Sequence, residues 1–136
     1  MLTNARGVPV GVAVAGANRY DVMPLAPTLA SVPVPRPRPT ARRPQGVCLD
    51  TAYDITWVYR LLTDAGFTPH VRAIREDVTA RRRGTRARRW VVERTRSWMN
   101  RFRALLVRWD KRTTNYEAGL HLASAYISVA RAGLLG

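Results

Sequence analysis

Cysteine, lysine and acidic residues are scarce in this chain, and each shortage narrows what the protein can be. Its 136 residues include one cysteine, Cys48, so an internal disulfide and a cysteine-based zinc finger are both excluded. Because Cys48 lies in an apolar Val-Cys-Leu run, we expect its thiol to be buried. Nine acidic residues stand against 22 arginines and one lysine, which gives a net charge of +14. That charge indicates a polyanionic partner, and arginine binds phosphate through two N–H groups at once.

Long hydrophobic runs are also lacking. No run approaches the roughly 18 apolar residues that a membrane span needs, so we expect a cytoplasmic protein without a membrane partner. Residues Met1–Ala17 imitate a short secretion signal, because one arginine precedes an apolar run. Pro9 and Gly11 interrupt that run, and valines at every second position from Val8 to Val14 favour a β-strand instead. Hydrophobic residues make up 46% of the chain, which suffices for the core of one modest domain.

An arginine-rich stretch from residue 88 to residue 109 has the clearest periodicity. Apolar residues recur there at steps of three and four, which predicts one amphipathic helix with a wide apolar stripe. The stripe consists of Val91, Trp98, Phe102, Leu105 and Trp109, with Met99 and Leu106 beside it. Glu93 is the one carboxylate between Asp77 and Asp110, and arginines lie on both sides of it in the sequence. Spacing alone favours salt bridges for Glu93 over the alternative, a metal ion held at a DNA phosphate.

Several short segments have the composition of β-strands. Leu2–Thr3 and Val8–Ala15 are expected to pair as a hairpin, since a turn containing glycine joins them. Gly46–Leu49 is a short apolar strand, and Asp50 follows it at the carboxyl end, where open sheets place functional groups. Phe67–Ile74 is expected to be a further strand. Asp50 is therefore a candidate metal ligand at a sheet edge.

Helices are expected between and after these strands. Asp54 is placed to cap a helix over Ile55–Asp64. The apolar face of this helix, expected to lie on the sheet, consists of Trp57, Val58, Leu61 and Leu62. A loop and short helix occupy Asn18–Leu29, where we favour Asp21 as a cap over Asp21 as part of a metal site. Asn115–Leu135 is rich in alanine and predicts a long helix that packs closely on the helix carrying Glu93. Together the segments predict an α/β fold.

Two segments lack periodicity. Residues 31–45 are rich in proline and arginine and are expected to be an extended linker. Residues 75–88 form a basic loop, which is either a solvated charge run or a clamp for DNA. For both His70 and His121, a core or surface role is favoured over metal ligation. We expect arginines of the loop and of the following helix to bind DNA, namely Arg81, Arg82, Arg83, Arg86, Arg88, Arg89, Arg94 and Arg101.

Residues Trp90–Phe102 contain a recognisable motif. An arginine lies four residues before a glutamate, here Arg89 and Glu93, and a Trp-x-Asn-Arg-Phe run follows. This motif resembles the C-terminal signature of bacterial insertion-sequence transposases of the DDE superfamily. Three upstream segments resemble, in the same order, that family's Gly-x-Pro turn, its Ala-Asn-x-x-Asp segment and its Asp-x-x-Tyr-Asp segment. They are Gly7-Val8-Pro9, Ala17-Asn18-Arg19-Tyr20-Asp21 and Leu49-Asp50-Thr51-Ala52-Tyr53-Asp54.

The resemblance implies a fold and an activity. Asp50 and Glu93 correspond to the second and third catalytic carboxylates, which hold Mg²⁺ or Mn²⁺ while phosphodiester bonds of DNA are cut and joined. The implied fold is ribonuclease H-like, here a truncated mixed sheet with flanking helices and a long C-terminal helical pair, in one partial domain over residues 1–136. The implied partner is double-stranded DNA of transposon ends and target, in the nucleoid. The upstream half of the transposase and a second copy of the chain are further candidate partners.

Departures from the family pattern leave an alternative open. The family's first aspartate lies upstream of the Gly-x-Pro turn, so we expect this chain to lack it and to be inactive alone. Ala52 replaces a typical glycine, and Asn4 stands where aspartate is common. The alternative to a transposase part is a non-catalytic basic DNA-binding fragment or relic. An unrelated RNA-binding protein would require the ordered matches to be chance.

Overall fold

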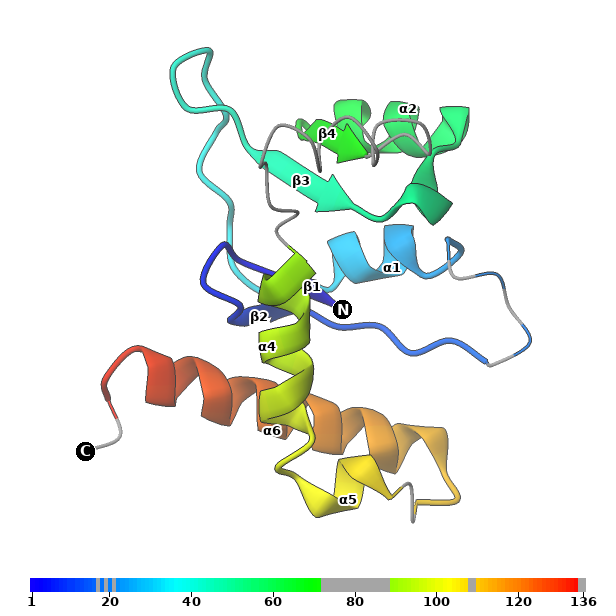
Figure 1. Cartoon of the computed structure of the whole chain (residues 1–136), viewed down its shortest axis with the longest axis vertical. Helices are drawn as coiled ribbons and strands as arrows, with labels where there is room; N and C mark the ends of the chain where they lie inside the picture. The colour runs from blue at the N-terminus through cyan, green and yellow to red at the C-terminus, as the bar shows by residue number, and fades with distance from the viewer. Residues whose placement is uncertain (17, 19, 21, 72–88, 108–109, 135–136) are drawn as a thin grey trace, which may run out of the picture. The chain divides into compact units, whose positions relative to one another are not determined.

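The computed structural model describes residues 1–16, 18, 20, 22–71, 89–107 and 110–134 (Figure 1). Its elements group into two compact units. Unit 1 contains Met1–Arg19, Met23–Val34 and Arg89–Gly136, and unit 2 contains Tyr20–Val22 and Pro35–Arg88. Both units contain strands and helices, which confirms the α/β class. The assignment of residues 1–136 to one domain stays a prediction.

Unit 1 begins with the expected hairpin. Strand β1 (Leu2–Thr3) pairs antiparallel with β2 (Pro9–Gly11), so the second strand is shorter than the predicted Val8–Ala15. The side-chain oxygen of Asn4 accepts hydrogen bonds from the amides of Arg6 and Val8, at 2.9 and 3.0 Å. Asparagine side chains commonly hold turns in this way. The amide oxygen therefore provides the acceptor that an aspartate would offer at this position.

Helix α1 (Leu25–Ala30) packs against β2. The hydroxyl of Ser31, which follows the helix, accepts from the amide of Val12 and donates to the carbonyl of Thr28, both at 2.8 Å. Pro24 occupies the N-cap without a side-chain hydrogen bond. Asp21, the predicted cap, lies outside the described residues. The helix is therefore held by its C-terminal end and its buried Leu25 and Thr28.

The prediction of one helix over residues 88–109 is wrong. Helix α4 (Arg89–Met99) ends before Asn100, and a separate short helix α5 (Arg103–Leu106) follows the extended Phe102. The ring of Phe102 packs edge-on against the ring of Tyr126, with centroids 5.8 Å apart. Asparagine favours non-helical backbone, so the chain turns at Asn100 and both short helices reach the same partner helix. Trp109, the last residue of the predicted stripe, lies outside the described residues.

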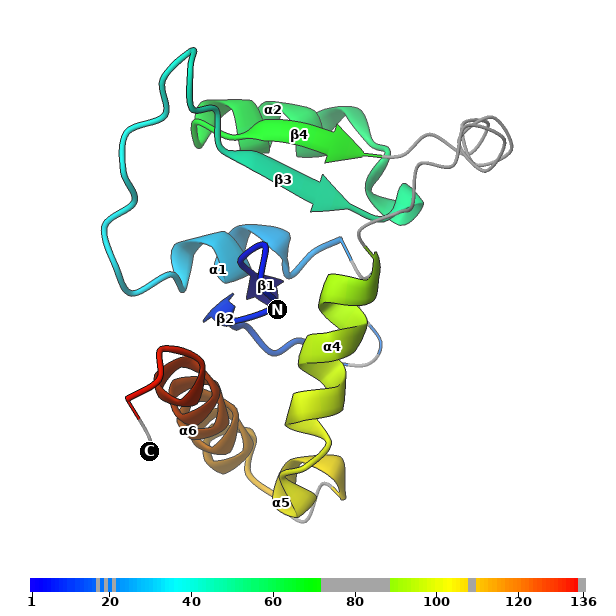
Figure 2. The ribbon, with the colours of Figure 1, turned by 60° about the vertical axis from the view of Figure 1, so that its left-hand side comes forward.

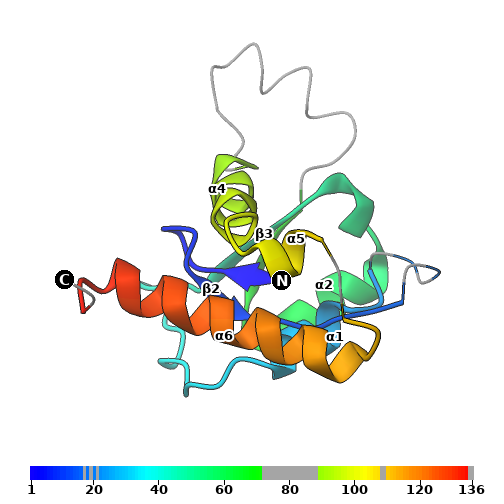
Figure 3. The same ribbon diagram turned by 90° about the horizontal axis from the view of Figure 1, so that it is seen from below.

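That partner is α6 (Thr113–Arg131), which confirms the long helix predicted over Asn115–Leu135. It contacts α4, α5 and β2, and Figure 3 shows it running past the hairpin. The buried cluster between these helices is Met99, Ala123 and Ile127, with Trp98, Phe102 and Leu105 packed on it. A Cβ added at Gly119 would lie 3.2 Å from Leu105, so the small residues of α6 do allow close packing.

Unit 2 is built on a parallel pair of strands. Strand β3 (Gly46–Leu49) pairs with β4 (Thr68–Val71), and the connection between them is the 3-10 helix η1 (Thr51–Tyr53) and helix α2 (Thr56–Asp64). Helix α2 packs against β4, as Figure 2 shows. Parallel strands need such a crossover. The part of the predicted strand beyond Val71 lies outside the described residues.

Three details of unit 2 differ from the predictions. Cys48 is exposed rather than buried, because Val47 faces the core and the next side chain of a strand points to the opposite face. Ile55, not Asp54, occupies the N-cap of α2, and Asp54 instead accepts a hydrogen bond from the hydroxyl of Tyr59 at 2.9 Å. On α2, Val58 and Leu62 are fully buried, whereas Trp57, also predicted to face the sheet, is 41% exposed.

The proline-rich segment is tied to unit 2 over part of its length. The guanidinium of Arg36 lies 3.8 Å from the ring centre of Phe67 and donates to Ala65 and Gln45. Gln45 in turn donates to the carbonyl of Pro37 at 2.6 Å. Arg36 therefore acts as an anchor for the predicted linker.

Among the described residues, the strands form two separate two-stranded sheets. A single mixed sheet of ribonuclease H-like type stays a prediction. Within the same residues, no helix is both long and apolar enough to cross a membrane.

Candidate catalytic carboxylates and basic surface

Asp50 lies where the sequence predicted, directly after β3. Its side chain is exposed, and its Oδ1 accepts a hydrogen bond of 2.7 Å from the amide of Thr51. This bond makes Asp50 the N-cap of η1, with the backbone of Asp50 extended. The cap uses one carboxylate oxygen and fixes the direction of the side chain at the carboxyl end of a parallel pair. Such a position offers the second oxygen to a ligand.

Glu93 lies on α4 and is exposed. The opposite face of α4 is buried, with Val91 7%, Met99 8% and Thr95 0% exposed. Since successive residues of a helix are 100° apart, burial of that face turns Glu93 away from the core. The carboxylate is therefore available to solvent and to ligands on a helix whose other side is fixed.

The two carboxylates belong to different units. Asp50 is part of unit 2, and Glu93 is part of unit 1. Among the described residues, no three or more His, Cys, Asp or Glu side chains form a group able to hold a metal. The side chains of His70 and His121 are exposed, so of the core and surface roles left open for each, the structure shows a surface position.

The arginines predicted to bind DNA are described in part. Arg94 and Arg101 are exposed, and Arg89 begins α4. The guanidinium of Arg94 lies over the ring of Trp90, 4.4 Å from its centre, which holds the cation one turn from its own backbone. Arg81, Arg82, Arg83, Arg86 and Arg88 lie outside the described residues, and so does the rest of the predicted basic loop.

Further exposed arginines lie on α4, α5 and α6 and were not among the eight arginines named as DNA-binding residues. Arg96 and Arg103 are exposed on α4 and α5. The guanidinium of Arg131, at the end of α6, lies 4.0 Å from the ring centre of Trp98. The sequence pointed to these arginines only through the overall excess of arginine, and that excess does not distinguish an arginine that binds DNA from one that is merely solvated.

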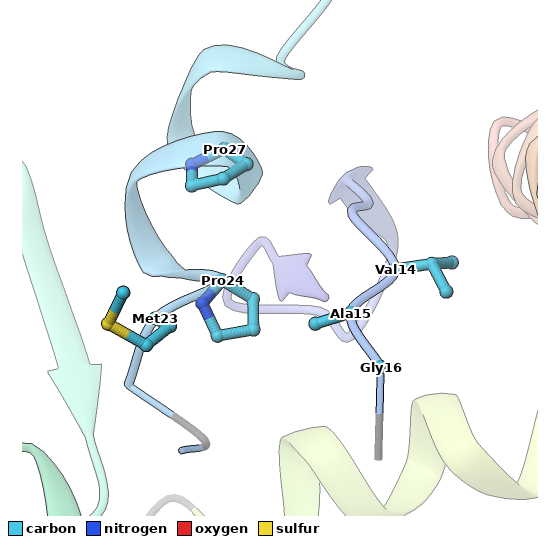
Figure 4. Close-up of a pocket in the computed structure, with 6 residues that line it drawn as sticks. All are labelled: Val14, Ala15, Gly16, Met23, Pro24 and Pro27. Atoms are coloured by element: carbon cyan, nitrogen blue, oxygen red, sulfur yellow. The ribbon is translucent and has the colours of Figure 1, made fainter. Parts of the chain in front are cut away.

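A pocket in unit 1 is lined by Val14, Ala15, Gly16, Met23, Pro24 and Pro27 (Figure 4). None of these side chains is titratable or nucleophilic. Neither Asp50 nor Glu93 lines this pocket, so it has no part in the candidate site.

Comparison with known proteins agrees with the motif. Residues 1–128 match the family model described as the transposase DDE domain. A protein of Burkholderia cepacia, assigned as transposase for insertion sequence element IS402, is 34% identical over 129 residues. The alignment covers 93% of this chain and 60% of the relative, so the chain spans about 60% of the relative's length. No solved structure matches the chain. Because the family model covers nearly the whole sequence, the chain belongs to the transposase DDE domain family.

Proposed function

We propose that the chain acts in DNA transposition, as part of the catalytic domain of an insertion-sequence transposase. The observation that carries the proposal is the placement of Asp50 and Glu93. Asp50 is exposed directly after β3, and Glu93 is exposed on a helix whose other side is buried, in a chain of the transposase DDE domain family. Carboxylates are the side chains that hold divalent metal ions in metal-dependent phosphodiester cleavage.

The donor chemistry of Asp50 and Glu93 fits a hard divalent cation. Mg²⁺ prefers oxygen donors, binds through one or two carboxylates, and fills its remaining positions with water and phosphate oxygens. Asp50 and Glu93 would hold Mg²⁺ or Mn²⁺, together with a further aspartate that the family pattern places ahead of the Gly7-Val8-Pro9 turn. When bound, the ion would activate a water molecule or a 3′-hydroxyl as the nucleophile and would neutralise negative charge on the leaving oxygen.

Arginines of α4 and its flanks would hold the DNA substrate. Arg94 and Arg101 are exposed on the same chain segment as Glu93, and the net charge of +14 attracts a polyanion from any direction. Each guanidinium bound to a phosphate displaces a condensed counterion, which favours binding at low salt. Arg94 lies on the same helix as Glu93, and Arg101 lies in the turn directly after that helix.

The test is cleavage of transposon-end DNA by a complete transposase that carries these 136 residues. We expect Asp50→Asn and Glu93→Gln each to lower the Mg²⁺-dependent cleavage rate by at least about a hundred-fold, because each removes a charge needed in the transition state. Asp64→Asn is the matched control, since Asp64 is an exposed aspartate at the end of α2. Retained cleavage in either carboxylate variant contradicts the proposal.

The second candidate function is DNA binding without catalysis. It is favoured by the charge alone, since 23 basic residues stand against nine acidic ones. In that case Glu93→Gln leaves DNA affinity unchanged, and Mg²⁺ has no effect beyond ionic screening. A measured cleavage activity that depends on Glu93 excludes this second function as the whole role.

A further inference from the structure

A buried threonine joins α4 to the hairpin. The hydroxyl of Thr95 is 2.5 Å from the carbonyl oxygen of Gly7, 88 residues earlier in the chain, and 3.1 Å from that of Val91. Thr95 is 0% exposed, and it is one of two buried polar residues among those described. A hydroxyl carries one proton, so the shorter distance makes the Gly7 carbonyl its main acceptor and the Val91 carbonyl the secondary one. We name this bond the Thr95–Gly7 link.

The hairpin turn is shaped to present the carbonyl of Gly7. Gly7 has φ +82°, a conformation that side chains other than glycine rarely adopt, and its amide donates to the carbonyl of Asn4 at 3.0 Å. The side chain of Asn4 accepts two further backbone hydrogen bonds within the same turn. A Cβ at Gly7 would lie 3.2 Å from both Thr95 Oγ1 and the Val91 carbonyl. The turn thus approaches α4 as closely as backbone without a side chain allows.

The link fixes the rotation of α4 about its own axis. Thr95 and Glu93 are two residues apart, which places them about 200° apart around the helix. An atom about 6 Å from the axis moves by about 1 Å when the helix turns by about 10°. Displacements of about 1 Å at a reacting group cost about a hundred-fold in rate. Thr95 therefore holds one side of a helix whose other side carries Glu93.

The side chain of Arg94 passes close to the Gly7 turn. Its Cδ lies 3.6 Å from the position that a Cβ at Gly7 would occupy, and its guanidinium continues to the ring of Trp90. The stem of Arg94 therefore lies beside the Gly7 turn, while its guanidinium is held by Trp90 and not by the turn.

We propose that Thr95 is a positioning residue for catalysis, which sets the place of Glu93 relative to the hairpin through the Thr95–Gly7 link. The inference rests on the proposed function, because it assigns to Thr95 the alignment of a carboxylate that acts there. Thr95 itself contacts neither metal nor DNA. Loss of the Thr95 hydroxyl should therefore lower the rate of the chemical step and leave the affinity for DNA unchanged.

The test compares three variants of a complete transposase that carries these residues. Thr95→Val keeps the shape and removes the hydroxyl, and Thr95→Ser keeps the hydroxyl. Ile127→Val removes one methyl group from the cluster that α6 shares with Met99 of α4 and leaves the link in place. We expect Thr95→Val to lower kcat for end cleavage by about ten- to a hundred-fold, with KM for DNA within about two-fold of the parent. Thr95→Ser should restore kcat, and Ile127→Val should leave it unchanged.

Amide hydrogen exchange on the 136-residue chain provides a readout apart from activity. Thr95→Val should speed exchange in the turn around Gly7 and along α4, whereas Thr95→Ser should not. Unchanged exchange in Thr95→Val overturns the link. A normal kcat in Thr95→Val, or a kcat in Thr95→Ser as low as in Thr95→Val, overturns the positioning role. The proposed function is still supported in that case if Glu93→Gln loses activity. Normal cleavage by Glu93→Gln refutes the proposed function, and the positioning role with it.

Discussion

Replacing Gly7 and Gly133 by alanine separates two costs of adding a side chain, the strain of a positive φ and steric crowding by neighbouring atoms. Both have positive φ, +82° and +73°, but a Cβ at Gly7 would meet Val91 and Thr95 at 3.2 Å, whereas a Cβ at Gly133 would meet nothing within 4 Å. Gly133→Ala should lower the free energy of unfolding by about 1 kcal/mol, the cost of the left-handed conformation. Gly7→Ala should lower it by about 2–3 kcal/mol, because crowding adds to that cost.

Urea unfolding of the full chain, followed by far-ultraviolet circular dichroism, measures both values. Equal decreases in the two variants would contradict the close approach of the hairpin turn to α4. Since glycine has no side chain, neither substitution removes any side-chain packing that the parent protein has.

The two carboxylates were predictable from sequence, and Thr95 was not. Asp50 follows a short apolar strand and Glu93 interrupts an arginine-rich helix, so each differs visibly from its neighbours. A single threonine in an amphipathic helix carries no such signal, because threonine occurs on either face. Its role depends on a carbonyl 88 residues away, and a contact so distant leaves no local pattern. Asp50 and Glu93 stay predicted as catalytic residues until their variants are measured.

At the scale of elements, the cluster between α4, α5 and α6 carries much of the packing of unit 1. Ile127 is 5% exposed within it, whereas Leu122 on the same helix is 73% exposed. Ile127→Ala should destabilise the chain by about 2–5 kcal/mol, through reduced burial and the cavity left behind. Leu122→Ala, the control, should change stability by less than about 0.5 kcal/mol.

Thermal unfolding of the two variants beside the parent checks this expectation. A similar shift in the two midpoints would show that α6 is not packed through Ile127. Because both variants shorten an aliphatic residue of the same helix to alanine, helix propensity changes little between them.

Periodicity predicted where most elements lie but not where they break. The hairpin, β3, α2 and α6 all fall within or close to their predicted ranges, since each has a local pattern of its own. The separation of α4 from α5 was missed because the apolar stripe continues through Phe102 at helical spacing. The spacing of apolar residues records which side chains are buried, but it does not show that the chain turns at Asn100 before Phe102 packs on Tyr126. The prediction that the Cys48 thiol is buried was wrong for a similar reason, because an apolar run does not reveal which face of a sheet is covered.

At the scale of the whole chain, the net charge of +14 attracts polyanions. Its 22 arginines outnumber the phosphates that a small protein contacts, so most of them supply a general field. Sequence alone therefore predicts that DNA is attracted. Arg94 on α4 and Arg101 just after it are both exposed, and their predicted binding to phosphate can be tested directly.

Salt dependence distinguishes direct phosphate binding from the general field. Binding of the chain to duplex DNA should weaken steeply with salt, and the slope of log K against log salt should fall by about 0.9 for each phosphate that is no longer neutralised. The double variant Arg94→Gln and Arg101→Gln should therefore reduce the slope by about two. Arg60→Gln, an exposed arginine on α2 outside the candidate surface, should leave the slope nearly unchanged although it removes a charge.

Fluorescence anisotropy with a labelled duplex, between about 50 and 200 mM salt, measures these slopes. Equal slopes for the double variant and the parent would mean that Arg94 and Arg101 do not bind phosphate, and would move the DNA surface away from α4. A reduced slope with an intact Glu93 would place substrate phosphates next to the candidate carboxylate. A metal ion held by Glu93 can act on DNA only if a phosphate lies this close to the carboxylate.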